Sequence, residues 1–188
     1  MPYPPYVTVG ANTYHGPDLL LHRWGAEKIT IGKFCSISQQ VKIMAGGNHR
    51  TDSVSTYPFD TLLAKTASYP TEDRSYDAKN GDIEIGSDVW IGFGASIMGS
   101  CKIGHGAVIA ANATVFTDIP PYAIAVGNPA RVTKYRFSEA QIKQLLNIAW
   151  WDWPEEKIKA RLDDFYKHVE YFITAQPVYE WLGEPGHA

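Results

Sequence analysis

Aliphatic residues recur every six positions along two stretches of this chain, and no other feature limits its fold as strongly. The leading residues of the repeat are Ile31, Ile37, Ile43, Ile85, Ile91, Ile97, Ile103, Ile109 and Val115. Residues that lie six positions apart do not share one face of an α-helix, and the glycines among them would weaken a helix. The repeat therefore predicts a mainly β protein.

A second set of residues, mostly small or β-branched, lies four positions after the leads. Its members are Cys35, Val41, Gly47, Val89, Ala95, Cys101, Ala107, Ala113 and Ile119. A period of six with glycine after many leads is typical of a parallel β-helix, in which each hexad forms one short strand and a turn. Three hexads complete a triangular coil with the leads inside. We predict three regular coils, preceded by a less regular opening coil from residues 9–11 and 26–30.

Between the two stretches the repeat stops, and a polar, turn-prone segment begins with GGNHRTDSVSTYPF at residues 46–59. We interpret residues 48–82 as a loop that leaves the β-helix, whose domain spans residues 1–134. The remaining residues, 135–188, are predicted to form a helical tail that covers the end of the β-helix and contacts other subunits. Ser138 and Gln141 fit a capping box at its first helix, and Pro154 is well placed to begin a second.

Composition excludes several classes of partner. The chain has 188 residues and a formal net charge of −3, with no cluster of Lys and Arg that would bind nucleic acid. No apolar run approaches the roughly 20 residues of a membrane helix. The N-terminus lacks the basic and apolar segments of a signal peptide. A cytoplasmic protein without membrane or nucleic-acid partners is the expectation.

Five segments in order resemble the xenobiotic acetyltransferase branch of the hexapeptide family, which includes type B chloramphenicol acetyltransferases and streptogramin (virginiamycin) acetyltransferases. They are IGKFCSI, the NHR-containing loop, WIG at residues 90–92, GNPAR at 127–131 and WWDWP at 150–154. The resemblance covers about residues 9–165. It implies a left-handed β-helix, although the usual rule for parallel crossovers favours the other hand. It also implies a homotrimer that binds acetyl-CoA between subunits and acetylates a hydroxyl of a small molecule, with chloramphenicol and streptogramin A compounds as candidate acceptors.

By its position in the resemblance, His49 is the general base of this reaction. An alcohol is a weak nucleophile at neutral pH, and a base that takes its proton accelerates attack about 10²–10⁴-fold. Histidine suits this role because its side chain titrates near neutrality. Transfer is expected to be direct, without an acyl-enzyme. Candidate acceptor-binding residues are Tyr14, Asn48, Tyr57, Trp90 and Met98. Asn48 is equally suited to capping a turn, and Tyr57 to anchoring the loop.

Coenzyme binding in this family implies a groove along the coils rather than a charged phosphate loop. Gly92, Ala110 and Ala111 are small enough to leave the backbone open to the pantetheine arm, and Thr117 lies where the groove continues. Arg131 and Lys134 are candidates for the coenzyme phosphates, or are ordinary solvated charges. No metal is expected.

Three alternatives stay open. A sugar or another metabolite is an alternative acceptor class for the same fold and chemistry, although the TYPF segment of the loop and the WWDWP tail argue against the sugar acetyltransferases. A metal-dependent hydratase of the carbonic anhydrase type would need histidines that converge on zinc. His105 supplies one, but Ala110 stands where the second is expected. A non-catalytic hexapeptide protein would not bind acetyl-CoA.

Overall fold

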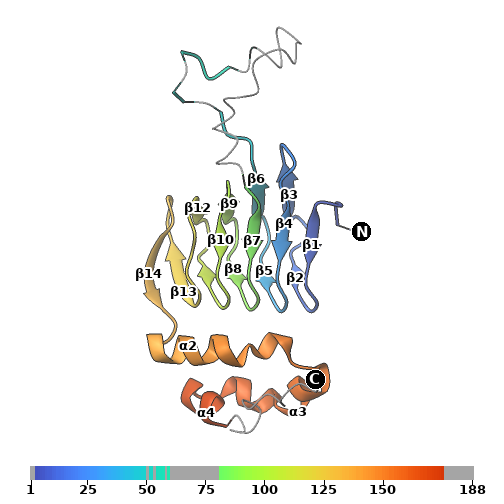
Figure 1. Ribbon diagram of the computed structural model, residues 1–188, viewed down its shortest axis with the longest axis vertical. Helices are drawn as coiled ribbons and strands as arrows, with labels where there is room; N and C mark the ends of the chain where they lie inside the picture. The colour runs from blue at the N-terminus through green and yellow to red at the C-terminus, as the bar shows by residue number, and fades with distance from the viewer. Residues whose placement is uncertain (1–2, 50, 53, 58, 60–80, 176–188) are drawn as a thin grey trace, which may run out of the picture. The chain divides into compact units, whose positions relative to one another are not determined.

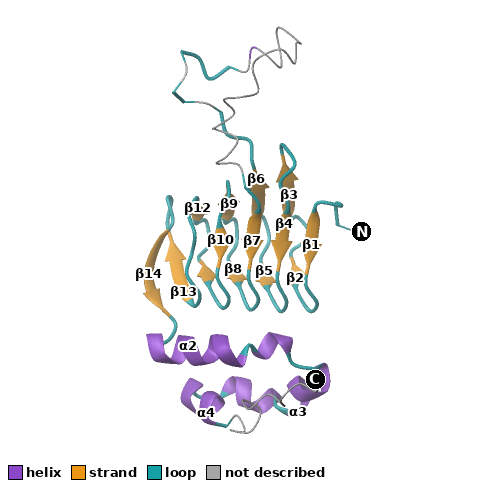
Figure 2. Ribbon diagram, viewed as in Figure 1, coloured by secondary structure: helices purple, strands orange, loops and turns teal. Residues whose placement is uncertain are grey.

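The structure, a computed structural model, describes residues 3–49, 51–52, 54–57, 59 and 81–175. The chain divides into two compact units, Met1–Arg136 and Phe137–Ala188. Strands build the first unit and helices the second (Figures 1 and 2). We predicted residues 1–134 for the β-helix and 135–188 for the tail. The last strand, β14 (Arg131–Tyr135), extends one residue beyond the predicted boundary.

The first unit is a parallel β-helix with three faces, each made of strands stacked from successive coils. The first sheet contains β1 (Val7–Val9), β4 (Ile29–Ile31), β7 (Ile83–Ile85) and β10 (Lys102–Ile103). The second contains β2 (Tyr14–His15), β5 (Ser36–Ile37), β8 (Trp90–Ile91), β11 (Val108–Ile109), β13 (Ala123–Val126) and β14. The third contains β3 (Leu20–Arg23), β6 (Lys42–Ala45), β9 (Ser96–Met98) and β12 (Thr114–Val115).

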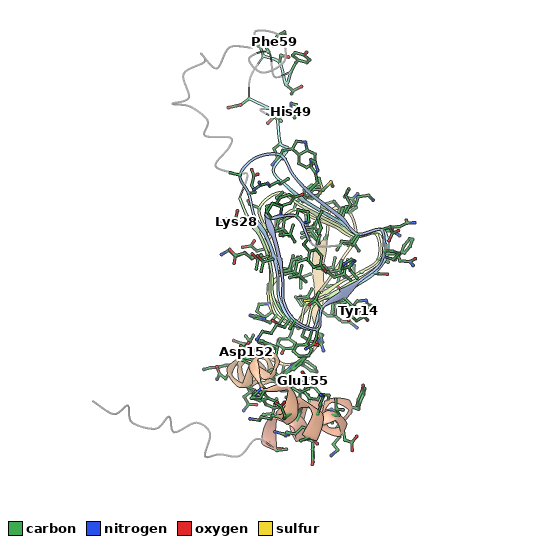
Figure 3. All side chains as sticks on the ribbon, turned by 90° about the vertical axis from the view of Figure 1, so that its right-hand side faces the viewer. Tyr14, Lys28, His49, Phe59, Asp152 and Glu155 are labelled. Atoms are coloured by element: carbon green, nitrogen blue, oxygen red, sulfur yellow. The ribbon has the colours of Figure 1, made fainter. Side chains whose placement is uncertain are left out.

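The predicted leads form the core. All nine have exposed fractions of 3% or less, and register pairs them with their equivalents one coil away. Figure 3 shows the triangular section with side chains filling its interior. The second set is buried too, because each member lies two residues before the next lead and so points to the same side of its strand. Gly47 is the exception, since the chain has already left the coil there.

The opening coil is more regular than the prediction. Val9 and Leu21 lie in register with Ile31 and Ile43, and His15 lies in register with Ile37. Three hexads therefore precede the nine that we recognised, and residues 24–28 are an interruption after them rather than part of the opening coil. The exposed, polar His15 at a lead position hid this coil from a search for aliphatic residues.

Two corners of the triangle repeat one left-handed residue in coil after coil. At the corner between the first and second sheets, residues with φ between 56° and 68° are Asn12, Phe34, Asp88, Gly106 and Tyr122. At the next corner they are Gln40, Gly94 and Asn112. Each corner also receives a backbone hydrogen bond from the coil beside it, such as Asp88 N–H to Lys33 O at 2.9 Å. The corners are therefore stacked turns that hold successive coils in register.

The helical unit contains α2 (Glu139–Ile148), α3 (Glu155–Ala160) and α4 (Val169–Thr174), with short 3₁₀ helices at Trp150–Asp152 and Leu162–Tyr166. The predicted capping box is confirmed at α2, and α3 begins directly after Pro154. Aromatic rings join the helices: Phe165 lies 4.9 Å from Trp150 and 5.0 Å from Phe172 between centroids. The tail's role as a cap stays a prediction.

Candidate active site

His49 lies four residues after the end of β6, on the segment that leaves the β-helix. Its Nδ1 lies 2.7 Å from the backbone oxygen of Thr56. A carbonyl oxygen only accepts hydrogen bonds, so Nδ1 is the donor in this contact, and in the neutral ring Nε2 is then the nitrogen with the lone pair. The ring is exposed to solvent. His49 is thus held in the tautomer that a general base acting through Nε2 requires.

The other residues considered on this loop, Asn48, Tyr57 and Phe59, lie close to His49 in the sequence. Asn48 is exposed, and the rings of Tyr57 and Phe59 meet edge to face with centroids 4.9 Å apart. Both rings are about half exposed, at 49% and 51%. The pair is an apolar surface on the loop that carries His49, and it is compatible with loop anchoring and with acceptor binding.

Two predicted acceptor residues share one row on the outside of the second sheet. Register pairs Tyr14 with Ser36, Ser36 with Trp90, and Trp90 with Val108. The same row continues through Ile124 to Lys134, one of the predicted coenzyme residues. Tyr14 and Trp90 are 66% and 57% exposed, so this face offers two large aromatic surfaces.

Met98 belongs to another face. It lies on β9 of the third sheet, where register pairs it with Met44 on β6. Figure 3 shows His49 beyond one corner of the triangle and Tyr14 on the opposite side. Within one chain, the predicted acceptor residues therefore lie on the loop, the second sheet and the third sheet, and the row with Tyr14 and Trp90 does not face His49.

The predicted coenzyme residues lie in three places. Gly92, Ala110 and Ala111 stack at the corner after the second sheet, where a Cβ on Gly92 would lie 2.6 Å from the Ala111 nitrogen. Close stacking alone thus requires glycine at 92, and its contact with the coenzyme stays a prediction. Thr117 is exposed at the corner after the third sheet, and the remaining two, Arg131 and Lys134, are exposed on β14.

The structure adds a hollow that the sequence did not indicate. Its volume is about 350 Å³, and it is lined by Phe34, Ser36, Asp88, Val89, Trp90, Val108 and Arg136. At one side Arg136 Nη1 lies 3.2 Å from Asp88 Oδ2 and donates a hydrogen bond to Gly106 O at 2.7 Å. Burial raises the pKa of Asp88, and the neighbouring guanidinium only partly opposes this. The hollow adjoins Trp90 and is compatible with a small apolar group beside an ion pair.

The residues invoked for the metal-dependent alternative are structural in this chain. His105 Nδ1 accepts the Ser87 N–H at 2.8 Å and so helps to stack two coils. In the described ranges, no group of three or more His, Cys, Asp or Glu is arranged to hold a metal ion. The same ranges contain no helix that is long and apolar enough to span a bilayer.

Comparison with known proteins agrees with this architecture. The family described as bacterial transferase hexapeptide (six repeats) matches residues 82–117. Chloramphenicol acetyltransferase of Escherichia coli is 46% identical over 157 residues, which are 78% of this chain and 73% of that protein. Virginiamycin A acetyltransferase of Staphylococcus aureus is 45% identical over 127 residues, 67% of this chain and 57% of that protein. The crystal structure of a maltose O-acetyltransferase from Clostridium difficile 630 superposes with a TM-score of 0.54 at 30% identity, over 71% of this chain and 61% of the other.

Stacked hexads and these relatives together define the class: the chain belongs to the hexapeptide-repeat acetyltransferases. Its sequence relatives place it in the branch with the chloramphenicol and virginiamycin acetyltransferases. The resemblance drawn from the NHR loop and WWDWP is confirmed, and the chain is an acetyltransferase.

Proposed function

We propose that this enzyme transfers acetyl from acetyl-CoA to a hydroxyl of an antibiotic-like acceptor of the chloramphenicol or streptogramin A type. The named activities of the two sequence relatives support this acceptor class. The exposed aromatic row of Tyr14 and Trp90, with the hollow beside it, supports an acceptor with apolar surface.

The observation that carries the mechanism is the contact between His49 Nδ1 and Thr56 O. It leaves Nε2 of His49 to take the proton of the acceptor hydroxyl as the oxygen attacks the acetyl carbon. The resulting tetrahedral intermediate collapses as its carbon–sulfur bond breaks. The departing coenzyme A thiolate then takes the proton from His49. This direct transfer leaves His49 unchanged at the end of the cycle.

A covalent acyl-enzyme finds little support in this chain. Both cysteines are buried, and burial raises the pKa of each thiol. A thiol of this kind is seldom ionised and is a poor nucleophile. This supports direct transfer from acetyl-CoA to the acceptor in a ternary complex.

We propose further that the coil is left-handed and that three copies assemble with the sites between them. The separation of His49 from the Tyr14–Trp90 row within one chain supports the assembly, because the loop of one copy can then meet the row of the next. Acetyl-CoA would lie in the groove between copies, along Ala110, Ala111 and Gly92. Thr117, Arg131 and Lys134 would lie further along the groove, and the helical tail would cover the end of the β-helix.

A sugar acceptor is the second candidate. The likeness to a maltose O-acetyltransferase at 30% identity favours it, because that protein shares the fold and the named chemistry on a sugar hydroxyl. In this case His49 keeps its role and only the acceptor changes.

A thiol-release assay tests the acceptor and the base together. Purified enzyme is given acetyl-CoA with chloramphenicol, virginiamycin M or maltose, and His49→Ala is assayed in parallel. We expect turnover of an antibiotic, reduced about 10²–10⁴-fold in the variant because the base is lost. Turnover that is equal in the two proteins contradicts the role of His49. Turnover of maltose alone replaces the acceptor class and keeps the base.

A further inference from the structure

Residues that have no role in the proposed mechanism pack against the base of the loop that carries His49. The chain leaves β6 through Gly46 and Gly47, whose φ angles are 73° and 79°. Two peptide steps lead from Gly47 to His49, so their Cα atoms lie within about 7.6 Å of each other. The direction that the chain takes at these glycines therefore decides where the imidazole lies.

Trp24 lies directly against the second glycine. A Cβ built on Gly47 would be 2.6 Å from Cε3 of the indole, so the ring is in contact with the Gly47 backbone. The backbone N–H of Trp24 donates a hydrogen bond to Ala45 O at 3.2 Å, which holds the Trp24 backbone against the end of β6. The ring, which is 58% exposed, also meets His22 edge to face, with centroids 4.3 Å apart. The indole is thus held between β3 and the start of the loop.

Glu27 lies against the first glycine in the same manner. A Cβ built on Gly46 would be 2.8 Å from Glu27 Oε1, and Gly46 is buried. The carboxylate is fixed because Oε2 accepts the Gly25 N–H at 2.9 Å. Arg23 Nη1 donates to Glu27 O at 3.1 Å and holds the turn from the other end. The short segment 24–28, which interrupts the hexads after the opening coil, therefore packs around both glycines.

We propose that Trp24 and Glu27 are positioning residues for His49: they fix the Gly46–Gly47 turn from which the histidine is presented. The inference rests on the proposed function, because it assumes that His49 is the base. Thr56 O then holds the ring from the downstream side while Trp24 and Glu27 hold the chain from the upstream side. A displacement of about 1 Å at a catalytic group can cost 10²-fold in rate.

Kinetics of Trp24→Ala test the proposal, with Leu20→Ala as the matched control. Leu20 lies on β3, the strand that ends directly before Trp24, and is 46% exposed, so its removal also deletes exposed apolar surface. With the acceptor that the wild type acetylates fastest, we expect Trp24→Ala to lower kcat about 10–100-fold and to leave KM for acetyl-CoA within about twofold. Trp24→Phe should retain at least about half of kcat, and Glu27→Ala should lower it about 3–10-fold. Leu20→Ala should match the wild type.

A double variant separates positioning from general damage. If Trp24 acts through His49, Trp24→Ala should have no further effect on the residual rate of His49→Ala. An equal loss in both backgrounds, or wild-type kcat in Trp24→Ala, overturns the proposal. Wild-type turnover in His49→Ala alone overturns the proposed base as well, and this outcome is recognised before any Trp24 variant is measured. Thermal melts of each variant confirm that the trimer is folded at the assay temperature.

Discussion

Burial sets the chemistry of the two cysteines. Cys35 and Cys101 stand at inward positions of the coils with exposed fractions of 0% and 2%. Burial raises the pKa of Cys101 to about 12, and the nearby Asp118 charge adds to the effect. Burial also raises the pKa of Cys35, whose Sγ lies 3.1 Å from Gly86 O. Since the thiolate is the reactive form, neither side chain should react while the protein is folded.

This predicts the outcome of a thiol titration. Native enzyme at pH 8 should show no fast reaction with Ellman's reagent, and the same protein in guanidinium should release two equivalents. At pH 8 a thiol with the pKa of Cys101 is ionised only about once in ten thousand molecules. One equivalent that reacts within seconds in the native protein would show that a coil opens at that temperature. The expected silence also means that the enzyme's thiols do not disturb a thiol-release assay.

Single residues differ in how far the sequence could reveal them. His49 stood out because a polar loop with a familiar pattern began where the hexads ended. Asp88 and Arg136 did not, because they are 48 residues apart and only the stacking of coils brings them together. The contacts of Trp24 and Glu27 with the two glycines were equally unpredictable, since such contacts produce no repeating pattern in the sequence. The motifs therefore predicted the loop that carries His49, but not the residues that pack against its base.

At the scale of the element, strands and turns followed from the hexads with few errors. The leads and their second set predicted every strand of the regular coils, because an inward residue must recur at the same place in each stacked layer. Three features escaped. The opening coil has His15 at a lead position, β13 extends the parallel second sheet beyond the nine recognised hexads, and β14 pairs antiparallel to β13, which a parallel repeat does not encode. Polar or antiparallel departures at the ends of a repeat carry no periodic signal.

Two glycines, Gly32 after β4 of the first sheet and Gly99 after β9 of the third, allow a direct test of this stacking. A Cβ on Gly32 would lie 2.5 Å from the carbonyl carbon of Gly86 in the next coil, so Gly32→Ala must separate two coils. We expect a loss of about 3 kcal/mol in the free energy of unfolding. Gly99 has a positive φ of 70°, and none of the described residues places an atom within 4 Å of its Cβ position, so Gly99→Ala should cost only about 1 kcal/mol of backbone strain.

Guanidinium unfolding at one fixed protein concentration measures both variants, because the stability of an oligomer depends on concentration. Equal losses in Gly32→Ala and Gly99→Ala would mean that the neighbouring coil accommodates the added methyl group, and that the contact between coils does not set the requirement for glycine at position 32.

At the scale of the whole molecule, the separation of His49 from Trp90 within one chain predicts complementation between subunits. His49→Ala and Trp90→Ala chains, each expected to be less active than the wild type, should regain activity when they are unfolded together and refolded as mixtures of the proposed trimer. If one copy supplies the loop and its neighbour the aromatic row, about a quarter of the sites in a random mixture receive both intact residues. Each variant refolded alone is the control. A mixture no more active than the separate variants would place both residues of a site in one chain.

The excursion after β6 has a consequence for how such an enzyme can change. Strands β4 and β7 pair in register although residues 46–82 lie between β6 and β7, so the stack continues across the gap. Because the segment begins and ends at one corner, its length and composition can vary without shifting the ladder of isoleucines. The proposed acceptor contacts of the excursion, Asn48 and Tyr57, can thus change without a change in the buried core of the β-helix. Exchange of this segment between relatives, in evolution or by design, can therefore change the loop's contacts with the acceptor while the coils stay the same.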